Sequence, residues 1–167
     1  QESADRDPLT GLYNRRWLSR HLPQVLELAQ RHHRPYCACM LDIDHFKLIN
    51  DQYGHLVGDS ALQWVAEQIS RHLRKTDSLV RVGGEEFLLL LPETALHGSH
   101  ELAARICQYI AAHAFAPVFD TPLSVTVSIG VAQLHHGDSV DSLINNADNA
   151  MYVAKQQGRN RVVLAGL

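Results

Sequence analysis

The stretch LVRVGGEEFLLLLP, residues Leu79–Pro92, has two apolar runs that flank a glycine pair, and two carboxylates directly after that pair. Two glycines between strand-like runs predict a tight β-hairpin in which Gly83 and Gly84 both take positive φ. Glu85 and Glu86 then lie at the hairpin tip, where buried carboxylates are costly unless a cation or hydrogen-bond donors compensate them. Taken alone, the stretch is also compatible with an ordinary hairpin whose acidic tip faces water.

A second acidic cluster ends the apolar run CACMLDID, residues 37–44. We expect this run to be a strand close to the hairpin, because ligand-binding groups gather at the carboxyl ends of strands in sheets with helical crossovers. We expect Asp42 and Asp44 to project to opposite faces of the strand end, with Asp42 facing the hairpin tip. Asp42 and Glu85, helped by the Ile43 carbonyl, would then share a hard cation such as Mg²⁺.

The composition indicates one folded domain over residues 1–167, with 46% apolar residues and a sizeable core. The net charge of -3 argues against nonspecific binding to nucleic acid or to an anionic membrane surface. No apolar run approaches the roughly 20 residues that span a bilayer. Cys37 and Cys39 alternate along the expected strand, so they should share a buried face with reduced thiols, as should Cys107 elsewhere in the core.

The remaining pattern alternates helices and strands. We expect helices over residues 15–31, from 46 onward, and over 59–74, 95–113 and 139–157, with strands ending near 42 and spanning 123–132 and 161–164. Gly130, inside the strand at 123–132, indicates a bulge or a close approach. Such an order with one central hairpin predicts a mixed sheet covered by helices.

The GGEEF sequence at residues 83–87 resembles the signature of GGDEF domains, the diguanylate cyclases, with Glu in place of Asp. Further motifs similar to that family follow in the same order: DPLTGLYNRR at 7–16, DIDHFKLIND at 42–51, GHLVGD at 54–59, ADNAMY at 147–152 and KQQGRN at 155–160. The resemblance implies an α+β fold with a central mixed five-stranded sheet and a β-hairpin, ferredoxin-like and shared with nucleotide cyclases and polymerase palms. It also implies the C-terminal part of a longer cytoplasmic protein, free or tethered to the inner membrane through a preceding region.

The family's reaction joins two GTP molecules into cyclic di-GMP and releases two pyrophosphates. The resemblance therefore implies an enzyme that works as a homodimer, with GTP as substrate and two Mg²⁺ or Mn²⁺ ions in each active site. The expected metal ligands are Asp42, Ile43, Glu85 and Glu86. The expected catalytic residues are Glu85, as base or only as metal ligand, and Lys47, which would stabilise charge on the phosphates. No nucleic acid and no membrane contact by this domain is expected.

The resemblance also assigns two binding sites. The substrate site comprises Phe46, Lys47, Asn50, His55, Asp59, Gly83, Gly84, Lys155 and Arg159. Asn50 and Asp59 would hold guanine, since a carboxylate accepts from guanine N1–H and N2, whereas adenine lacks the N1–H. Asp59 has a helix cap as its structural alternative, and Lys155 and Arg159 have charge compensation of a helix C-terminus as theirs.

The second site, at Arg74, Asp77 and Arg105, would bind cyclic di-GMP as an inhibitor. An arginine fork suits the O6/N7 edge of guanine, while the alternative is a local ion pair of little worth. Three other functions stay open: a non-catalytic cyclic di-GMP receptor, a cyclase for ATP or mixed nucleotides, and a domain that senses GTP without turnover.

Overall fold

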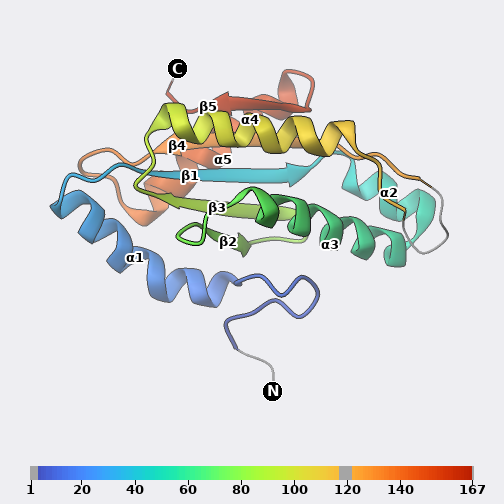
Figure 1. Ribbon diagram of the computed structural model, residues 1–167, viewed down its shortest axis with the longest axis horizontal. Coiled ribbons are helices and arrows are strands. Elements are labelled where there is room, and N and C mark those ends of the chain that lie inside the picture. The colour runs from blue at the N-terminus through green and yellow to red at the C-terminus, as the bar shows by residue number, and fades with distance from the viewer. Residues whose placement is uncertain (1–3, 117–121, 167) are drawn as a thin grey trace.

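A five-stranded sheet forms the centre of the computed structural model, which describes residues 4–116 and 122–166 (Figure 1). The strand order is β2-β3-β1-β4-β5. β1 is antiparallel to both β3 and β4, β2 is antiparallel to β3, and β5 is parallel to β4, so the expected mixed sheet with a β-hairpin is confirmed. The strands are β1 (Tyr36–Ile43), β2 (Ser78–Arg81), β3 (Glu86–Pro92), β4 (Val127–Gln133) and β5 (Arg161–Leu164).

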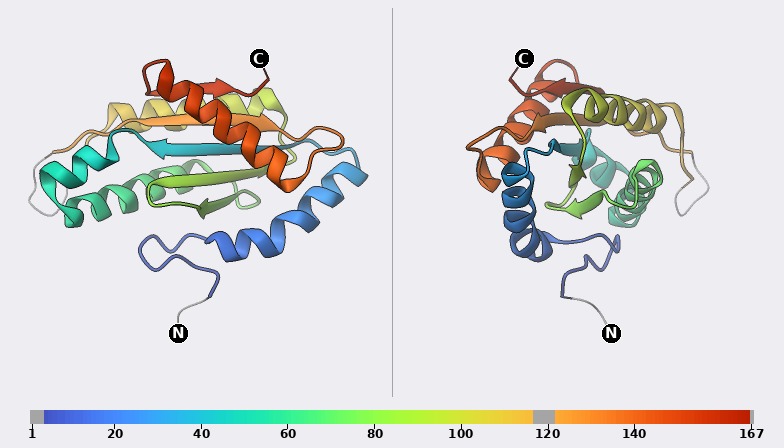
Figure 2. Two further views of the ribbon diagram at one scale, coloured as in Figure 1. Left: turned by 180° about the vertical axis from the view of Figure 1, so that it is seen from behind. Right: turned by 60° about the vertical axis from the view of Figure 1, so that its left-hand side comes forward.

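Helices cover both faces of this sheet. α1 and α5 lie on one face and α3 and α4 on the other, while α2 follows the carboxyl end of β1 (Figures 1 and 2). The helices are α1 (Arg15–Arg31), α2 (Phe46–Tyr53), α3 (His55–His72), α4 (Leu96–Ala112) and α5 (Val140–Gln156). No helix in the described ranges combines the length and hydropathy that a bilayer span requires.

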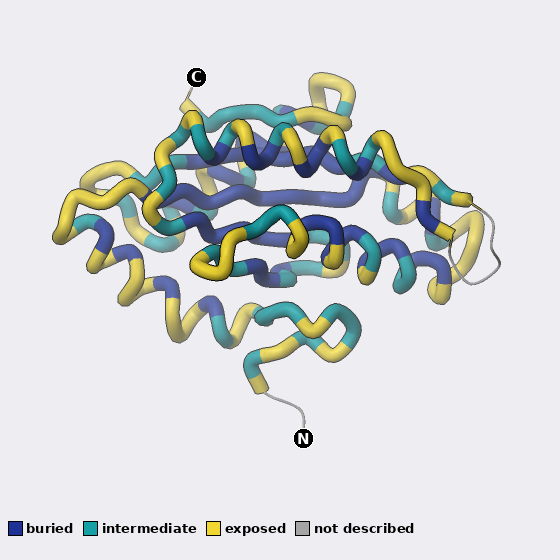
Figure 3. Tube along the Cα trace, viewed as in Figure 1, coloured by how far each residue is buried: buried dark blue, intermediate teal, exposed yellow. Residues whose placement is uncertain are grey.

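The central strand β1 is buried along its whole length (Figure 3). Cys37 and Cys39 face the core under α3 and α4, whereas Ala38 and Met40 face α1 and α5. The cysteines are free and fully buried, as predicted. A strand with apolar residues on both faces holds its end rigidly, and this end carries Asp42.

Two elements begin four residues away from the predicted position. α3 begins at His55 rather than at residue 59. Gly54, with a φ of 89°, separates it from α2, and Gly58 already has helical backbone. β4 begins at Val127 rather than at residue 123, because Leu123 exchanges backbone hydrogen bonds with Phe115 instead of joining the sheet.

The predicted tight turn at the signature glycines is wrong. Neither Gly83 nor Gly84 takes a positive φ, and residues 82–85 form a wider loop between β2 and β3. Arg81 donates from Nη2 to the Gly84 carbonyl at 2.8 Å, which holds this loop open. The close approach predicted at Gly130 is confirmed, since a Cβ there would lie 2.1 Å from the Ala147 carbonyl oxygen of α5.

Candidate active site

The sheet topology brings the acidic ends of two strands together. Because β1 runs antiparallel to β3 and β4, its carboxyl end meets the starts of both, and Asp42 lies opposite Glu86 and Ser128. β5 is parallel to β4 and begins at the same edge, directly after the end of α5. The carboxylates of β1 and β3 therefore face cationic residues from the C-terminus of α5.

A cavity of about 270 Å³ opens at this edge. Most of the predicted metal and phosphate residues line it, together with two residues of the β1–α2 connection and one of α2. The lining residues are Asp42, Ile43, Asp44, His45, Phe46, Lys47, Leu48, Glu85, Lys155 and Arg159. The predicted residues Gly83, Gly84, Glu86, Asn50, His55 and Asp59 lie outside this lining.

Asp42 is one of two buried acids that line this cavity, the other being Asp44, and only 4% of its surface is exposed. Lys155 donates from Nζ to its carboxylate at 2.5 Å. Burial raises the pKa of Asp42 to about 6; the Lys155 ammonium opposes the rise, and the charges of Glu85 and Asp44 add to it. Burial and the charge of Asp42 likewise raise the pKa of Glu86. Burial thus makes both carboxylates costly to ionise, and a bound cation would offset that cost.

The expectation that Asp42 and Asp44 project to opposite faces is wrong. Residues two positions apart in an extended chain share a face. Both carboxylates accordingly reach toward the C-terminal end of α5, Asp42 to the Lys155 ammonium and Asp44 to the Asn160 backbone N–H.

Among the described residues, no three His, Cys, Asp or Glu side chains form a ready metal-binding group.

The corner between α2 and α3 brings together the residues that were expected to bind the guanine base. A Cβ built on Gly58 would lie 1.8 Å from Asn50 Oδ1 and 3.4 Å from Phe46 Cζ, so these two side chains lie directly over the glycine. Asp59 is the next residue and is partly buried within α3. The N-cap of α3 is Gly54, so the alternative that Asp59 caps this helix is wrong.

Two cationic side chains at this cavity, Lys47 and Arg159, are weakly held. The Lys47 side chain is 90% exposed at the start of α2, and within the described part of the chain its ammonium pairs only with Asp51, at 3.5 Å. Among the described residues, the Arg159 guanidinium has no hydrogen-bond or ion-pair partner. Both side chains can therefore move onto an anion at this edge.

Two arginines that were not predicted as site residues support the loop at residues 82–85. Arg81 bridges Asp7, at 3.1 Å from Nη1 to Oδ2, and the Gly84 carbonyl, and Arg15 donates from Nε to the Val82 carbonyl. Burial acts to raise the pKa of Asp7, but hydrogen bonds from Thr10 and Arg81 hold it below its ordinary value. The sequence did offer a signal for these contacts: Arg81 interrupts the apolar run before the glycine pair, and Arg15 follows the turn-forming segment at residues 7–14. This arrangement supports a structural role for residues 7–16.

A separate cavity of about 260 Å³ brings Arg74, Asp77 and Arg105 together near the start of β2. The Arg74 guanidinium donates to Asp77 at 2.9 Å, to the Pro92 carbonyl at 2.9 Å and to Thr94 Oγ1 at 2.6 Å. It remains half exposed, so it is oriented and still open to a ligand.

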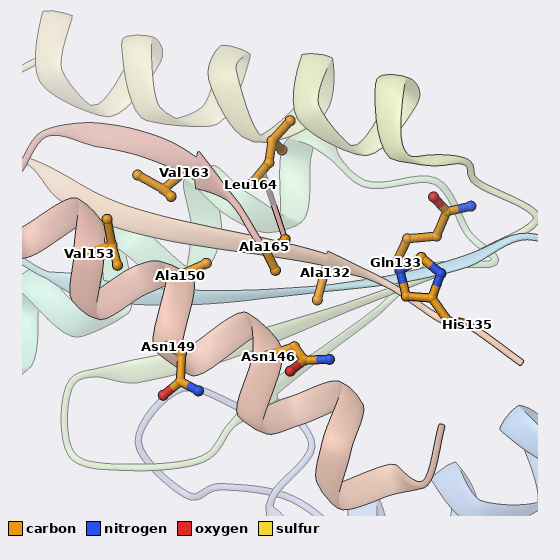
Figure 4. Close-up of a pocket in the computed structure, with 11 residues that line it drawn as sticks. Ala132, Gln133, His135, Asn146, Asn149, Ala150, Val153, Val163, Leu164 and Ala165 are labelled. Atoms are coloured by element: carbon orange, nitrogen blue, oxygen red, sulfur yellow. The ribbon is translucent and has the colours of Figure 1, made fainter. Parts of the chain in front are cut away.

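A larger cavity of about 410 Å³ lies between α5 and the β4–β5 edge (Figure 4). Asn146, Asn149 and His135 supply much of its polarity. The described residues that line it include no Asp, Glu, Lys or Arg side chain. Because charge rather than volume distinguishes a site for phosphates, we place the functional site at the smaller cavity.

Known proteins resemble this chain over nearly its full length. A family model described as "Diguanylate cyclase, GGDEF domain" matches residues 4–161. Diguanylate cyclase DgcP of Pseudomonas aeruginosa is 42% identical over 167 residues, which cover 99% of this chain and 24% of DgcP. The chain thus spans about a quarter of the length of this relative.

Two solved structures extend this similarity. The GGDEF domain of DgcB from Caulobacter crescentus, in complex with c-di-GMP, superposes with a TM-score of 0.96 at 33% identity, covering 100% of this chain and 96% of that one. The active GGEEF domain of a diguanylate cyclase from Vibrio cholerae superposes with a TM-score of 0.86 at 36% identity, covering 92% and 97%. The latter carries the same Glu variant of the signature that this chain has.

Proposed function

The chain belongs to the diguanylate cyclase GGDEF domain family, and from this membership we propose that it condenses two GTP molecules into cyclic di-GMP and two pyrophosphates. The observation that carries the proposal is the convergence of Asp42 and Glu85 with Lys155 and Arg159 around one cavity. This set has the carboxylate oxygens that hard cations prefer and the cations that a triphosphate needs.

The donor set fits Mg²⁺ or Mn²⁺. Asp42 and Glu85 offer carboxylate oxygens and Ile43 offers a carbonyl in the same lining. Glu86 lies opposite Asp42 in the sheet, and the charge of Asp42 contributes to the raised pKa of Glu86. Divalent ions bound there would lower the pKa of the attacking 3′-hydroxyl and neutralise charge on the phosphates. Since Lys155 now neutralises Asp42, it would be released toward the phosphates when a cation takes its place.

The remaining residues position the nucleotide. Asp59 would accept from the N1–H and N2 amine of guanine, and Asn50, held against Gly58, would bind the same base. Lys47 would neutralise the phosphates, as the first turn of a helix also favours anions. The attacking hydroxyl would come from a GTP held by a second copy of the domain, so each copy supplies half of the reacting pair.

The test is incubation of the protein with GTP and Mg²⁺, with chromatography to detect a cyclic dinucleotide. We expect product, no product after chelation, and a specific activity that rises with protein concentration because two domains must meet. A protein that binds cyclic di-GMP without making it would instead be a receptor. Strict proportionality between rate and protein concentration would contradict the shared site.

Product inhibition is the second part of the proposal. The oriented, half-exposed Arg74, with Asp77 and Arg105 at the same cavity, supports binding of a guanine edge. The c-di-GMP complex of the related DgcB domain makes cyclic di-GMP the first ligand to test.

Replacing Gly58 by alanine should displace Asn50, because the new Cβ would lie 1.8 Å from its side-chain oxygen. We expect kcat/KM for GTP to fall roughly tenfold, the size of one good hydrogen bond to the base. The measurement is a double-mutant cycle with Asn50→Ala. If Gly58→Ala costs the same with Asn50 present or absent, the glycine does not act through that side chain.

A further inference from the structure

Asp44 is a buried carboxylate to which the mechanism above gives no part. Only 4% of its surface is exposed. Its Oδ1 accepts from Ser128 Oγ at 2.7 Å, and its Oδ2 accepts from Thr126 Oγ1 at 2.7 Å and from the Asn160 backbone N–H at 3.0 Å. The protein itself therefore satisfies both oxygens, although Asp44 stands only two residues after Asp42 and lines the same cavity.

The Asn160 contact holds an unusual turn. Between α5 and β5 the three consecutive residues Gly158, Arg159 and Asn160 have φ values of 120°, 66° and 48°. Asn tolerates this region and Gly favours it, but for Arg159 the conformation is strained. Strained backbone persists where its surroundings hold it.

Hydrogen bonds hold this turn on both sides of Arg159. The Arg159 N–H donates to the Ala154 carbonyl of α5 at 3.0 Å, and the N–H of the next residue, Asn160, donates to Asp44. The Arg159 carbonyl accepts from Arg161 Nε at 3.0 Å. The backbone of Arg159 is thus fixed while its guanidinium has no partner among the described residues and lines the cavity.

We propose that Asp44 is a positioning residue: it locks the Gly158–Asn160 turn so that Arg159 reaches the β- and γ-phosphates of the bound nucleotide. Asp44 itself touches neither nucleotide nor metal. This inference rests on the proposed function, since it takes a nucleoside triphosphate as the occupant of the cavity. It accounts for the hydroxyls of Thr126 and Ser128 at alternate positions of an otherwise apolar segment.

The test compares Asp44→Ala with the conservative Asp44→Asn. Binding of 3′-deoxy-GTP, which lacks the attacking hydroxyl, and of GMP is measured by calorimetry with Mg²⁺. Asp44→Ala should weaken 3′-deoxy-GTP about tenfold or more and leave GMP within about twofold, because only the outer phosphates lose a partner. Asp44→Asn should stay within about threefold of wild type, since its oxygen can accept from Thr126 and Asn160 while its NH₂ donates to Ser128.

Two further readouts separate this role from others. In the absence of nucleotide, the backbone N–H of Asn160 should exchange its hydrogen with solvent faster in Asp44→Ala than in wild type or Asp44→Asn. The Mg²⁺ concentration for half-maximal binding of 3′-deoxy-GTP should be unchanged in Asp44→Ala but raised in Asp42→Asn. The exposed Asp141→Ala on α5 serves as the control and should match wild type throughout.

The inference is overturned if Asp44→Ala binds 3′-deoxy-GTP normally, weakens GMP equally, or is no worse than Asp44→Asn. If Asp44→Ala does not fold, Thr126→Val removes one donor to the same oxygen and should give a smaller loss of the same selectivity. Binding does not depend on turnover, so a wild type that binds 3′-deoxy-GTP but makes no cyclic dinucleotide would refute the proposed function and leave the role of Asp44 to these measurements.

Discussion

Replacing Asp42 by asparagine is expected to lower the rate of cyclic di-GMP formation by more than about 100-fold, because even groups that only orient a metal ligand contribute about 10–100-fold. The substitution keeps the shape of the side chain but removes the charge that Lys155 neutralises at 2.5 Å. It leaves Glu85 as the remaining carboxylate in the cavity lining apart from Asp44, whose oxygens are already satisfied. The measurement is the initial rate over a Mg²⁺ titration.

The same carboxylate gives this prediction a pH signature. The pKa of Asp42 is about 6 in the fold and 3.8 ordinarily. Below about pH 6 a cation must displace a proton from Asp42, so the apparent Mg²⁺ affinity should fall as pH decreases below 6 and level off above it. The raised pKa also means that its contribution to the free energy of unfolding declines as pH rises from about 4 to about 6. Both dependences should be weaker in Asp42→Asn.

The exposed Asp141→Asn, on α5 and outside the cavity, controls for loss of one negative charge. Circular dichroism and the melting temperature of Asp42→Asn establish that any loss is not unfolding. A folded Asp42→Asn protein with normal rate and normal Mg²⁺ dependence would remove Asp42 from the metal site, and the proposed mechanism with it.

The order of motifs predicted the fold, and most of the residues expected to bind metal and phosphate line one cavity. The apolar run that ends in Asp42 and Asp44 predicted the central strand, and the acidic residues at its end and after the glycine pair do meet, because antiparallel pairing sets Asp42 opposite Glu86. The helix starts expected at residues 15 and 139 agree with local chemistry, as Asn14 and Ser139 accept hydrogen bonds from the first turns of α1 and α5. These features depend on neighbours in sequence, which a single chain displays.

The failures have a common cause in contacts between distant segments. The open loop at Gly83 and Gly84 depends on Arg81, whose other partner is Asp7, and nothing in the hairpin sequence reveals that link. Gly58 lies inside α3 with Asn50 of α2 directly over it, and the residues around the glycine do not reveal that contact. The sequence around Asp44 did not indicate its role, because its hydrogen-bond partners Thr126, Ser128 and Asn160 are more than 80 residues away.

Replacing Asp59 by alanine is expected to lower kcat/KM for GTP roughly 10- to 100-fold, since a hydrogen bond to a charged group contributes about 1.5–3 kcal/mol and about 1.4 kcal/mol is a factor of ten. Asp59 does not cap α3, because the N-cap is Gly54, so its loss should leave the helix intact. Glu67→Ala is the matched control: this exposed acid lies on the same helix and pairs only at the surface with Arg71. Surface pairs of that kind contribute little, so its kinetics should equal those of wild type.

Inosine triphosphate makes the role of Asp59 specific, because hypoxanthine keeps the N1–H of guanine and lacks its 2-amino group. Wild type should prefer GTP over inosine triphosphate, and Asp59→Ala should lose most of that preference while Glu67→Ala keeps it. A site that hydrogen-bonds a substrate group discriminates against the analogue that lacks it, because its buried acceptor is then left unpaired. An Asp59→Ala protein that retains the full GTP preference would show that the base is read elsewhere, and the guanine pocket at Asn50 and Gly58 would have to be abandoned with it.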